Sequence, residues 1–186
     1  MSLPGAANDP AQRNRALTAV MFYLLTYAVM NIGAFAVVQL IARSGDRRTA
    51  IEDYRGIGFE SPVLAFSLSL FILSLFGMPL TAGFMGKILV FGAAIDQKYY
   101  GLVIVGVLNT AVSAYYYLRL IIVMFFGERT MAWSAPRVPA SVALALVITV
   151  LGVLYLGIFP GRVLNALQTR IESQLFTDQS IHGLRK

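Results

Sequence analysis

The chain has 186 residues, of which 58% are hydrophobic and 13% charged, with a mean hydropathy of +0.71 and a net charge of +6. Soluble domains carry about 25% charged residues, so the composition predicts an integral membrane protein. With no cysteine and one histidine, the chain lacks the usual ligands of iron–sulfur clusters and haem; its basic residues lie between apolar runs, which does not favour a nucleic-acid partner.

The first predicted elements are a loop over residues 1–15 and a membrane helix over Ala16–Ala42. The loop has no apolar core of the kind a signal peptide needs. The uncharged run after it exceeds the roughly 20 residues that span a bilayer. In the charged loop Arg43–Glu60, the residues Thr49-Ala50-Ile51-Glu52 have capping-box spacing and predict a short surface helix.

The next apolar stretch, residues 62–95, is interrupted by Gly77-Met78-Pro79. Proline lacks an amide hydrogen and disfavours helix in the preceding residue. We therefore predict two short helices, Pro62–Phe76 with Ser61 as N-cap and Leu80–Ile95. Short, glycine-interrupted segments are typical of discontinuous transporter helices. A helical hairpin, in which the glycines only permit close approach, is the alternative.

Two further membrane helices are predicted, Tyr99–Phe126 and Val138–Phe159. After Pro160, apolar residues recur at helical spacing, which predicts an amphipathic helix in residues 161–186, lying in the membrane interface or against the bundle. The expected fold is all-α: about five transmembrane helices within residues 16–160, one of them discontinuous. If each short helix crosses the membrane, nine Lys and Arg residues lie on one side and four on the other, an asymmetry that bears on orientation.

Only two charged residues, Lys87 and Arg119, lie inside the predicted spans. Lys87 is about 12 Å from either end of its helix, where insertion of lysine costs about 2.5–3.5 kcal/mol. Leu80, Gly83 and Ala94 share its helical face, so small residues leave space beside the amine for water or another helix. A buried lysine can gain and lose protons near neutral pH, which makes Lys87 a candidate for proton transfer. The alternative is a structural lysine bonded to carbonyl groups at the helix break.

The spans contain no acidic residue, so an acidic partner for Lys87 must come from a loop or another polypeptide. Arg119 stays charged and lies just after three tyrosines, so we expect it to reach the interface; the alternative is a role in fixing the local electric field. Other polar residues either bond between helices or order water. The candidate supporting residues are Asn31, Thr81, Asn109, Ser113 and Arg119, and those of the helix break are Gly77, Pro79, Gly83 and Gly86.

The run from Gly77 to Lys87, GMPLTAGFMGK, resembles the signature of the antiporter-like membrane subunits of bacterial complex I (NADH:quinone oxidoreductase), relatives of Mrp-type antiporters. The Gly-Lys ending followed by Ile88-Leu89-Val90-Phe91 is similar to subunit N; subunit M is expected to have glutamate at the position of Lys87. Weaker matches are Asn31–Phe35, Tyr54–Gly56 and Tyr115–Arg119.

The resemblance implies the C-terminal part of a fourteen-helix fold, with Lys87 as the titratable lysine of a broken helix and the five predicted helices as the last five. It implies a multi-pass protein of the bacterial inner membrane whose partners are the lipid bilayer and other complex I subunits, above all neighbouring antiporter-like ones. NADH, FMN, iron–sulfur clusters and quinone would belong to the whole complex, with none bound by this chain. A Mrp-type cation/proton antiporter without redox coupling is the alternative.

Overall fold

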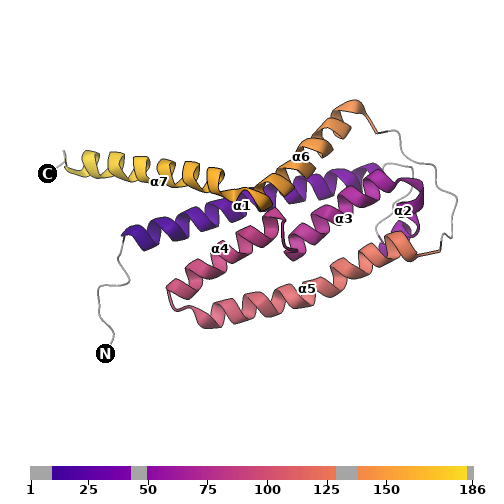
Figure 1. Cartoon of the computed structure of the whole chain (residues 1–186), viewed down its shortest axis with the longest axis horizontal. Coiled ribbons are helices and arrows are strands. Elements are labelled where there is room, and N and C mark those ends of the chain that lie inside the picture. Colours follow the sequence, from indigo (N-terminus) through magenta and orange to yellow (C-terminus); the bar gives the residue numbers. More distant parts are fainter. Residues whose placement is uncertain (1–9, 43–49, 129–137, 184–186) are drawn as a thin grey trace.

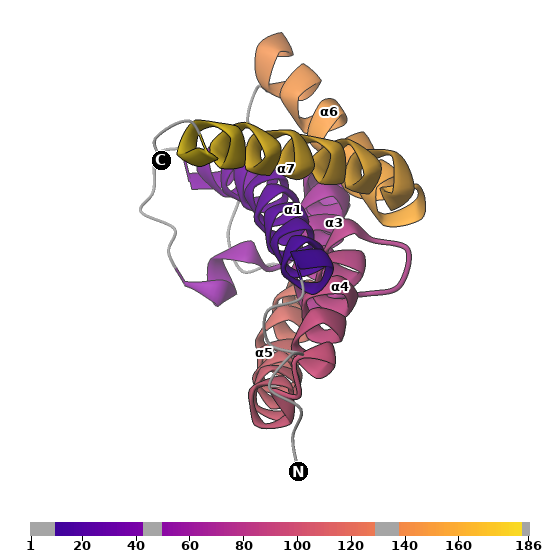
Figure 2. The ribbon, with the colours of Figure 1, turned by 90° about the vertical axis from the view of Figure 1, so that its left-hand side faces the viewer.

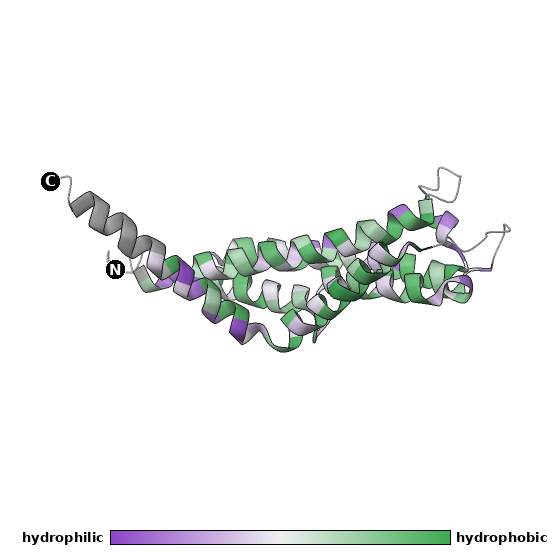
Figure 3. Ribbon diagram, turned by 90° about the horizontal axis from the view of Figure 1, so that it is seen from above, coloured by the Kyte–Doolittle hydropathy of each residue, from purple (hydrophilic) through white to green (hydrophobic). Residues whose placement is uncertain are grey.

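The computed structural model describes residues 10–42, 50–128 and 138–183, and every regular element within them is helical, as predicted. The elements are α1 (Pro10–Ala42), the 3₁₀ helix η2 (Ile51–Tyr54), α2 (Ile57–Glu60), α3 (Pro62–Phe76), α4 (Ala82–Asp96), α5 (Tyr100–Phe126), α6 (Ala140–Ile158) and α7 (Pro160–Gly183). Three of them, α1, α5 and α6, are long and apolar enough to cross a membrane. Hydrophobic residues cover most of the bundle, and hydrophilic ones gather toward its ends (Figure 3).

The first helix, α1, begins at Pro10, so the prediction of a loop through residue 15 is wrong for its last six residues; residues 1–9 lie outside the described part. Proline suits the first turn of a helix because its missing amide hydrogen would have no partner there. The first turn is joined to the end of α4, where Gln97 Nε2 donates to Gln12 Oε1 at 3.3 Å.

The short helices α3 and α4 follow one another along the long axis of the molecule and together cover its length beside α1 (Figure 1). Each has 15 residues, about 22 Å of helix, too little to span a bilayer core of about 30 Å. They are the two halves of one interrupted helix and not a hairpin. The end-to-end arrangement of α3 and α4 therefore predicts four membrane crossings in place of five.

The interrupted helix also changes the distribution of positive charge between the two ends of the bundle. The segments after α1 and after α5 leave from the same end, whereas the start of α1, the turn after α4 and α7 share the other (Figure 1). Grouped in this way, the Lys and Arg residues outside the predicted spans number six and seven. The nine-to-four asymmetry requires α3 and α4 to cross the membrane separately, and the side on which each end of the bundle lies stays a prediction.

The core lies where α1 crosses α3. Phe22, Met30 and Val37 of α1 are buried with Leu68 and Phe71 of α3. A Cβ on Gly33 would enter the ring of Phe71, so that ring lies directly on the α1 backbone.

The surface segment before α3 differs in detail from its prediction. The backbone amide of Ala50 donates to the carboxylate of Asp53 at 2.9 Å, so the residue that caps η2 lies one position after the predicted Glu52; Thr49 lies outside the described residues. Ser61 does precede α3 as its N-cap residue, but its side chain makes no capping bond.

The last helix, α7, begins directly after Phe159, and its first turns follow the predicted alternative of a helix packed on the bundle. Val163, Leu164 and Leu167 lie against the core, so its first turns belong to the bundle. It crosses α1 obliquely (Figure 2) and extends past the start of α1 (Figure 1). The interfacial position of that outer part stays a prediction.

Candidate functional site

The interruption between α3 and α4 begins at Gly77, whose φ of 98° ends α3 in a left-handed conformation. Glycine adopts this conformation without a steric penalty. The amides of Gly77 and Met78 both donate to the carbonyl of Leu73, at 3.0 and 2.9 Å. That carbonyl is satisfied, whereas those of Leu75 and Phe76 are left without helical partners.

The second half of the interruption is a turn that the sequence did not predict. Leu80 has a φ of 72°, uncommon for a residue with a side chain, and Thr81 is extended before α4 begins at Ala82. The buried hydroxyl of Thr81 donates to the carbonyl of Met78 at 2.6 Å. This turn moves the start of α4 two residues beyond the predicted Leu80.

Two glycines of α4 permit close approach to other helices. A Cβ on Gly83 would collide with the carbonyl oxygen of Ser74 in α3, and the Gly83 amide donates to the Ser74 hydroxyl at 3.2 Å. Gly86 faces Tyr23 and Thr26 of α1, 3.1 Å from the position of its Cβ. The space that Gly83 leaves is therefore occupied by α3, in agreement with the expectation that it would hold water or another helix.

Lys87 of α4 forms hydrogen bonds with the end of α3 across the interruption. Its Nζ donates to the carbonyl of Leu75 at 3.0 Å and to that of Phe76 at 2.8 Å, with the Thr110 hydroxyl oxygen at 3.5 Å. The stem of the side chain lies along Gly77, where a Cβ would be 3.3 Å from Lys87 Cδ. All three acceptors are neutral oxygens, and the C-terminal end of a helix carries a partial negative charge that favours a cation.

The other side of Lys87 faces a cavity of about 310 Å³ between α1, α4 and α5. Asn109, Thr110, Ser113 and Tyr117 line it from α5, with spacings of three and four that place them on one helical face. Tyr23 and Tyr27 line it from α1 with stacked rings, 5.9 Å between centroids. The cavity is roomy and polar enough to hold water.

Among the predicted supporting residues, Asn109 and Ser113 lie in this cavity, and the others do not. Asn31 donates to the Tyr27 carbonyl of its own helix at 2.8 Å, and Thr81 lies in the turn. Arg119 forms an ion pair with Glu52 of η2 at 3.1 Å. The carboxylate of Glu52, in the loop before α3, thus pairs with Arg119, and an acidic partner for Lys87 from a loop or another polypeptide stays a prediction.

The sequence did not identify Tyr23 or Tyr27 as site residues and indicated only an interfacial position for Tyr117. All three line the cavity. The four-residue spacing of the first pair signals a shared face, but nothing in the sequence says that this face meets α4. Within residues 10–42, 50–128 and 138–183, no three His, Cys, Asp or Glu side chains gather as a metal site requires.

Residues 10–113 match the family described as NADH:quinone oxidoreductase/Mrp antiporter, transmembrane. The chain is 45% identical to NADH-quinone oxidoreductase subunit N of Trichlorobacter lovleyi and 47% identical to subunit N 1 of Solibacter usitatus, covering 83% of this chain and 32% of each relative. The chain thus spans about a third of their length.

Among solved structures, a chain of respiratory complex I from Thermus thermophilus, determined with bound aureothin, matches with a TM-score of 0.70 and 36% identity. The match covers 81% of this chain and 34% of that one. The predicted resemblance to subunit N is confirmed by these relatives. With more than half of its residues inside the family match, this chain belongs to the NADH:quinone oxidoreductase/Mrp antiporter transmembrane family.

Proposed function

We propose that this chain is part of a proton-translocating membrane subunit of an NADH:quinone oxidoreductase, and that Lys87 takes up and releases the transported proton. The relatives named subunit N support this assignment. The chain would lie in the bacterial inner membrane against other membrane subunits of the complex, while NADH, FMN, iron–sulfur clusters and quinone are bound elsewhere. It would respond to conformational or electrostatic changes that quinone reduction produces.

The observation that carries the proposal is the position of the Lys87 ammonium, with carbonyl oxygens on one side and a polar cavity on the other. The Leu75 and Phe76 carbonyls stabilise the protonated amine. When the amine gives up its proton to water in the cavity, it loses the charge that strengthens both bonds. Proton release is therefore coupled to the contact between the two halves of the interrupted helix.

Replacing Lys87 by alanine in the assembled complex tests the proposal. We expect proton pumping and coupled quinone reduction to fall by about tenfold or more, because positioned proton-transfer groups contribute at least that much. Proton uptake and quinone reduction in inverted membrane vesicles measure both activities. Lys98→Ala is the control, because Lys98 is an exposed residue after α4, and it should behave as the native protein does.

Lys87→Arg separates proton transfer from a purely structural role. Arginine keeps the charge and the donors for the two carbonyls, but it does not release its proton. We expect this variant to assemble and still to pump poorly. An arginine variant with native pumping would mean that Lys87 only joins α4 to the end of α3.

A second candidate follows from the family, whose description also includes Mrp antiporters. In that case the chain would exchange a cation for a proton without redox coupling. Purification from native membranes decides between the two: copurifying flavin and iron–sulfur subunits support the oxidoreductase, and their absence supports the antiporter.

A further inference from the structure

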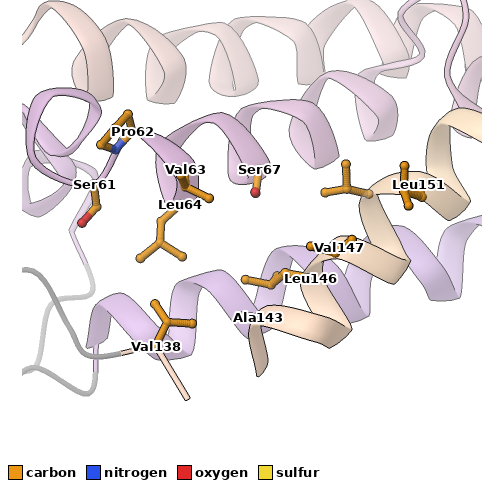
Figure 4. A pocket seen from close by; sticks show the side chains of 11 residues that line it. Ser61, Pro62, Val63, Leu64, Ser67, Val138, Ala143, Leu146, Val147 and Leu151 are labelled. Atoms are coloured by element: carbon orange, nitrogen blue, oxygen red, sulfur yellow. The ribbon is translucent and has the colours of Figure 1, made fainter. Parts of the chain in front are cut away.

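An apolar groove of about 490 Å³ separates α3 from α6, away from the Lys87 cavity (Figure 4). Its walls are aliphatic except for two serines. The residues that line it include Ser61, Val63, Ser67, Val138, Ala143 and Val147. The volume is within the roughly 300–1,000 Å³ of small-molecule sites.

Ser67 is the polar feature inside this groove. Only 8% of it is exposed, and its hydroxyl points into the groove (Figure 4). No part of the described chain forms a hydrogen bond with that hydroxyl. Because this hydroxyl opens onto an apolar groove, an occupant with an acceptor at this depth would supply the hydrogen bond that it lacks.

The mouth of the groove lies between two helix starts, those of α3 beside Ser61 and of α6 beside Val138 (Figure 4). The first amides of each helix have no acceptor within it, and both ends carry partial positive charge. Such ends favour a phosphate group. Ser67 lies five residues into α3 after Pro62, about 7.5 Å below the mouth.

We infer that this groove binds one glycerophospholipid. Its phosphate lies against the two helix starts, an ester carbonyl accepts a hydrogen bond from the Ser67 hydroxyl, and an acyl chain lies between α3 and α6. An apolar tail, a carbonyl acceptor and an anionic group occur in this order in a phospholipid. The lining contains no aromatic side chain to stack on a quinone ring.

The test compares phenylalanine at two alanines of α6. Ala143 lines the groove, whereas the exposed Ala145 does not. The assembled complex is reconstituted in nanodiscs of phosphatidylethanolamine and phosphatidylglycerol and re-extracted, and its bound phospholipids are counted by native mass spectrometry. We expect the native protein and Ala145→Phe to keep one phospholipid more per complex than Ala143→Phe. A Ser67→Ala variant, which leaves the groove open, should release that lipid about three- to tenfold faster, as loss of one hydrogen bond predicts.

Equal phospholipid counts in Ala143→Phe and Ala145→Phe would overturn the inference. It would also be overturned if the molecule lost in Ala143→Phe were a quinone and not a phospholipid. An unchanged release rate in Ser67→Ala would overturn the role of its hydroxyl. None of these results depends on proton pumping, so they test lipid binding in the groove independently of the proton-transfer role proposed for Lys87.

Discussion

At the residue scale, Lys87 supplies hydrogen-bond donors and a positive charge, and the end of α3 supplies the carbonyl acceptors. The lysine has no acidic partner among its bonded neighbours, and the carbonyls of Leu75 and Phe76 have no helical amide. Hydrogen bonds to a charged group contribute about 1.5–3 kcal/mol each. Two such bonds are comparable with the cost of about 2.5–3.5 kcal/mol for placing a lysine at the centre of a membrane helix. The lysine can therefore stay charged inside the bundle.

A substitution of Thr110 tests the third and longest hydrogen bond of the Lys87 amine. Its hydroxyl donates to the Gly106 carbonyl at 3.0 Å, which leaves its oxygen facing Lys87. Thr110→Val removes that oxygen with little change of shape. Because the contact with the ammonium is long, 3.5 Å, we expect proton pumping to slow by only about two- to threefold, the lower range for one hydrogen bond. Thr110→Ser should keep the native rate. Thr149→Val in α6, where the hydroxyl bonds only within its own helix, is the matched control, and an equal loss there would refute the specific role.

Lys87 could be predicted from the sequence because a lone lysine between apolar residues has few structural explanations. Its surroundings could not. The acceptors are backbone carbonyls, which every residue carries, and Tyr23 and Tyr27 lie 64 and 60 residues before Lys87 in the chain. Which helix faces meet depends on how α1, α4 and α5 cross, and hydropathy alone does not specify those crossings.

At the element scale, the interrupted helix depends on a glycine at one contact. Gly83→Ala would place a methyl group against the Ser74 carbonyl, so we expect a destabilisation of about 1–3 kcal/mol, as for other overfilled sites. Gly92→Ala is the control in the same helix, since a Cβ there meets nothing within 4 Å; it should be neutral or slightly stabilising. Thermal unfolding of the purified complex followed by the loss of this subunit measures both, and equal stability of the two variants would contradict this account.

The positions of the helices along the chain were more predictable than their arrangement relative to one another. The predicted boundaries of α3 to α6 lie within two residues of the observed ones, because proline, glycine and charge mark the ends of apolar runs. The start of α1 was missed because Gln12, Arg13 and Arg15 make the first turns polar, although such residues are good helix formers. The sequence also left open whether α3 and α4 form a hairpin, since both arrangements place glycine and proline at the bend.

At the scale of the whole molecule, the interrupted helix sets the topology. With four crossings, Glu52 and Glu128 lie at one end of the bundle and Lys98 at the other (Figure 1). The chain has no native cysteine, so single cysteines at these positions report their side of the membrane. In sealed vesicles of one orientation, an impermeant maleimide should label E52C and E128C from one side and K98C from the other. Labelling of E52C and K98C from the same side would indicate a hairpin and refute the four-crossing topology.

The most direct test of the central claim is chemical restoration of the amine in a Lys87→Cys variant of the assembled complex. A 2-aminoethyl thiosulfonate forms a disulfide with the introduced thiol, releases a sulfinate and leaves a primary amine about as far from the backbone as lysine's. The trimethylammonium analogue leaves a fixed positive charge that has no proton to release. We predict that the first reagent restores proton pumping and the second does not, although both label the introduced thiol through the cavity. Equal restoration by both, or no restoration after complete labelling with the amine, would contradict proton transfer by Lys87.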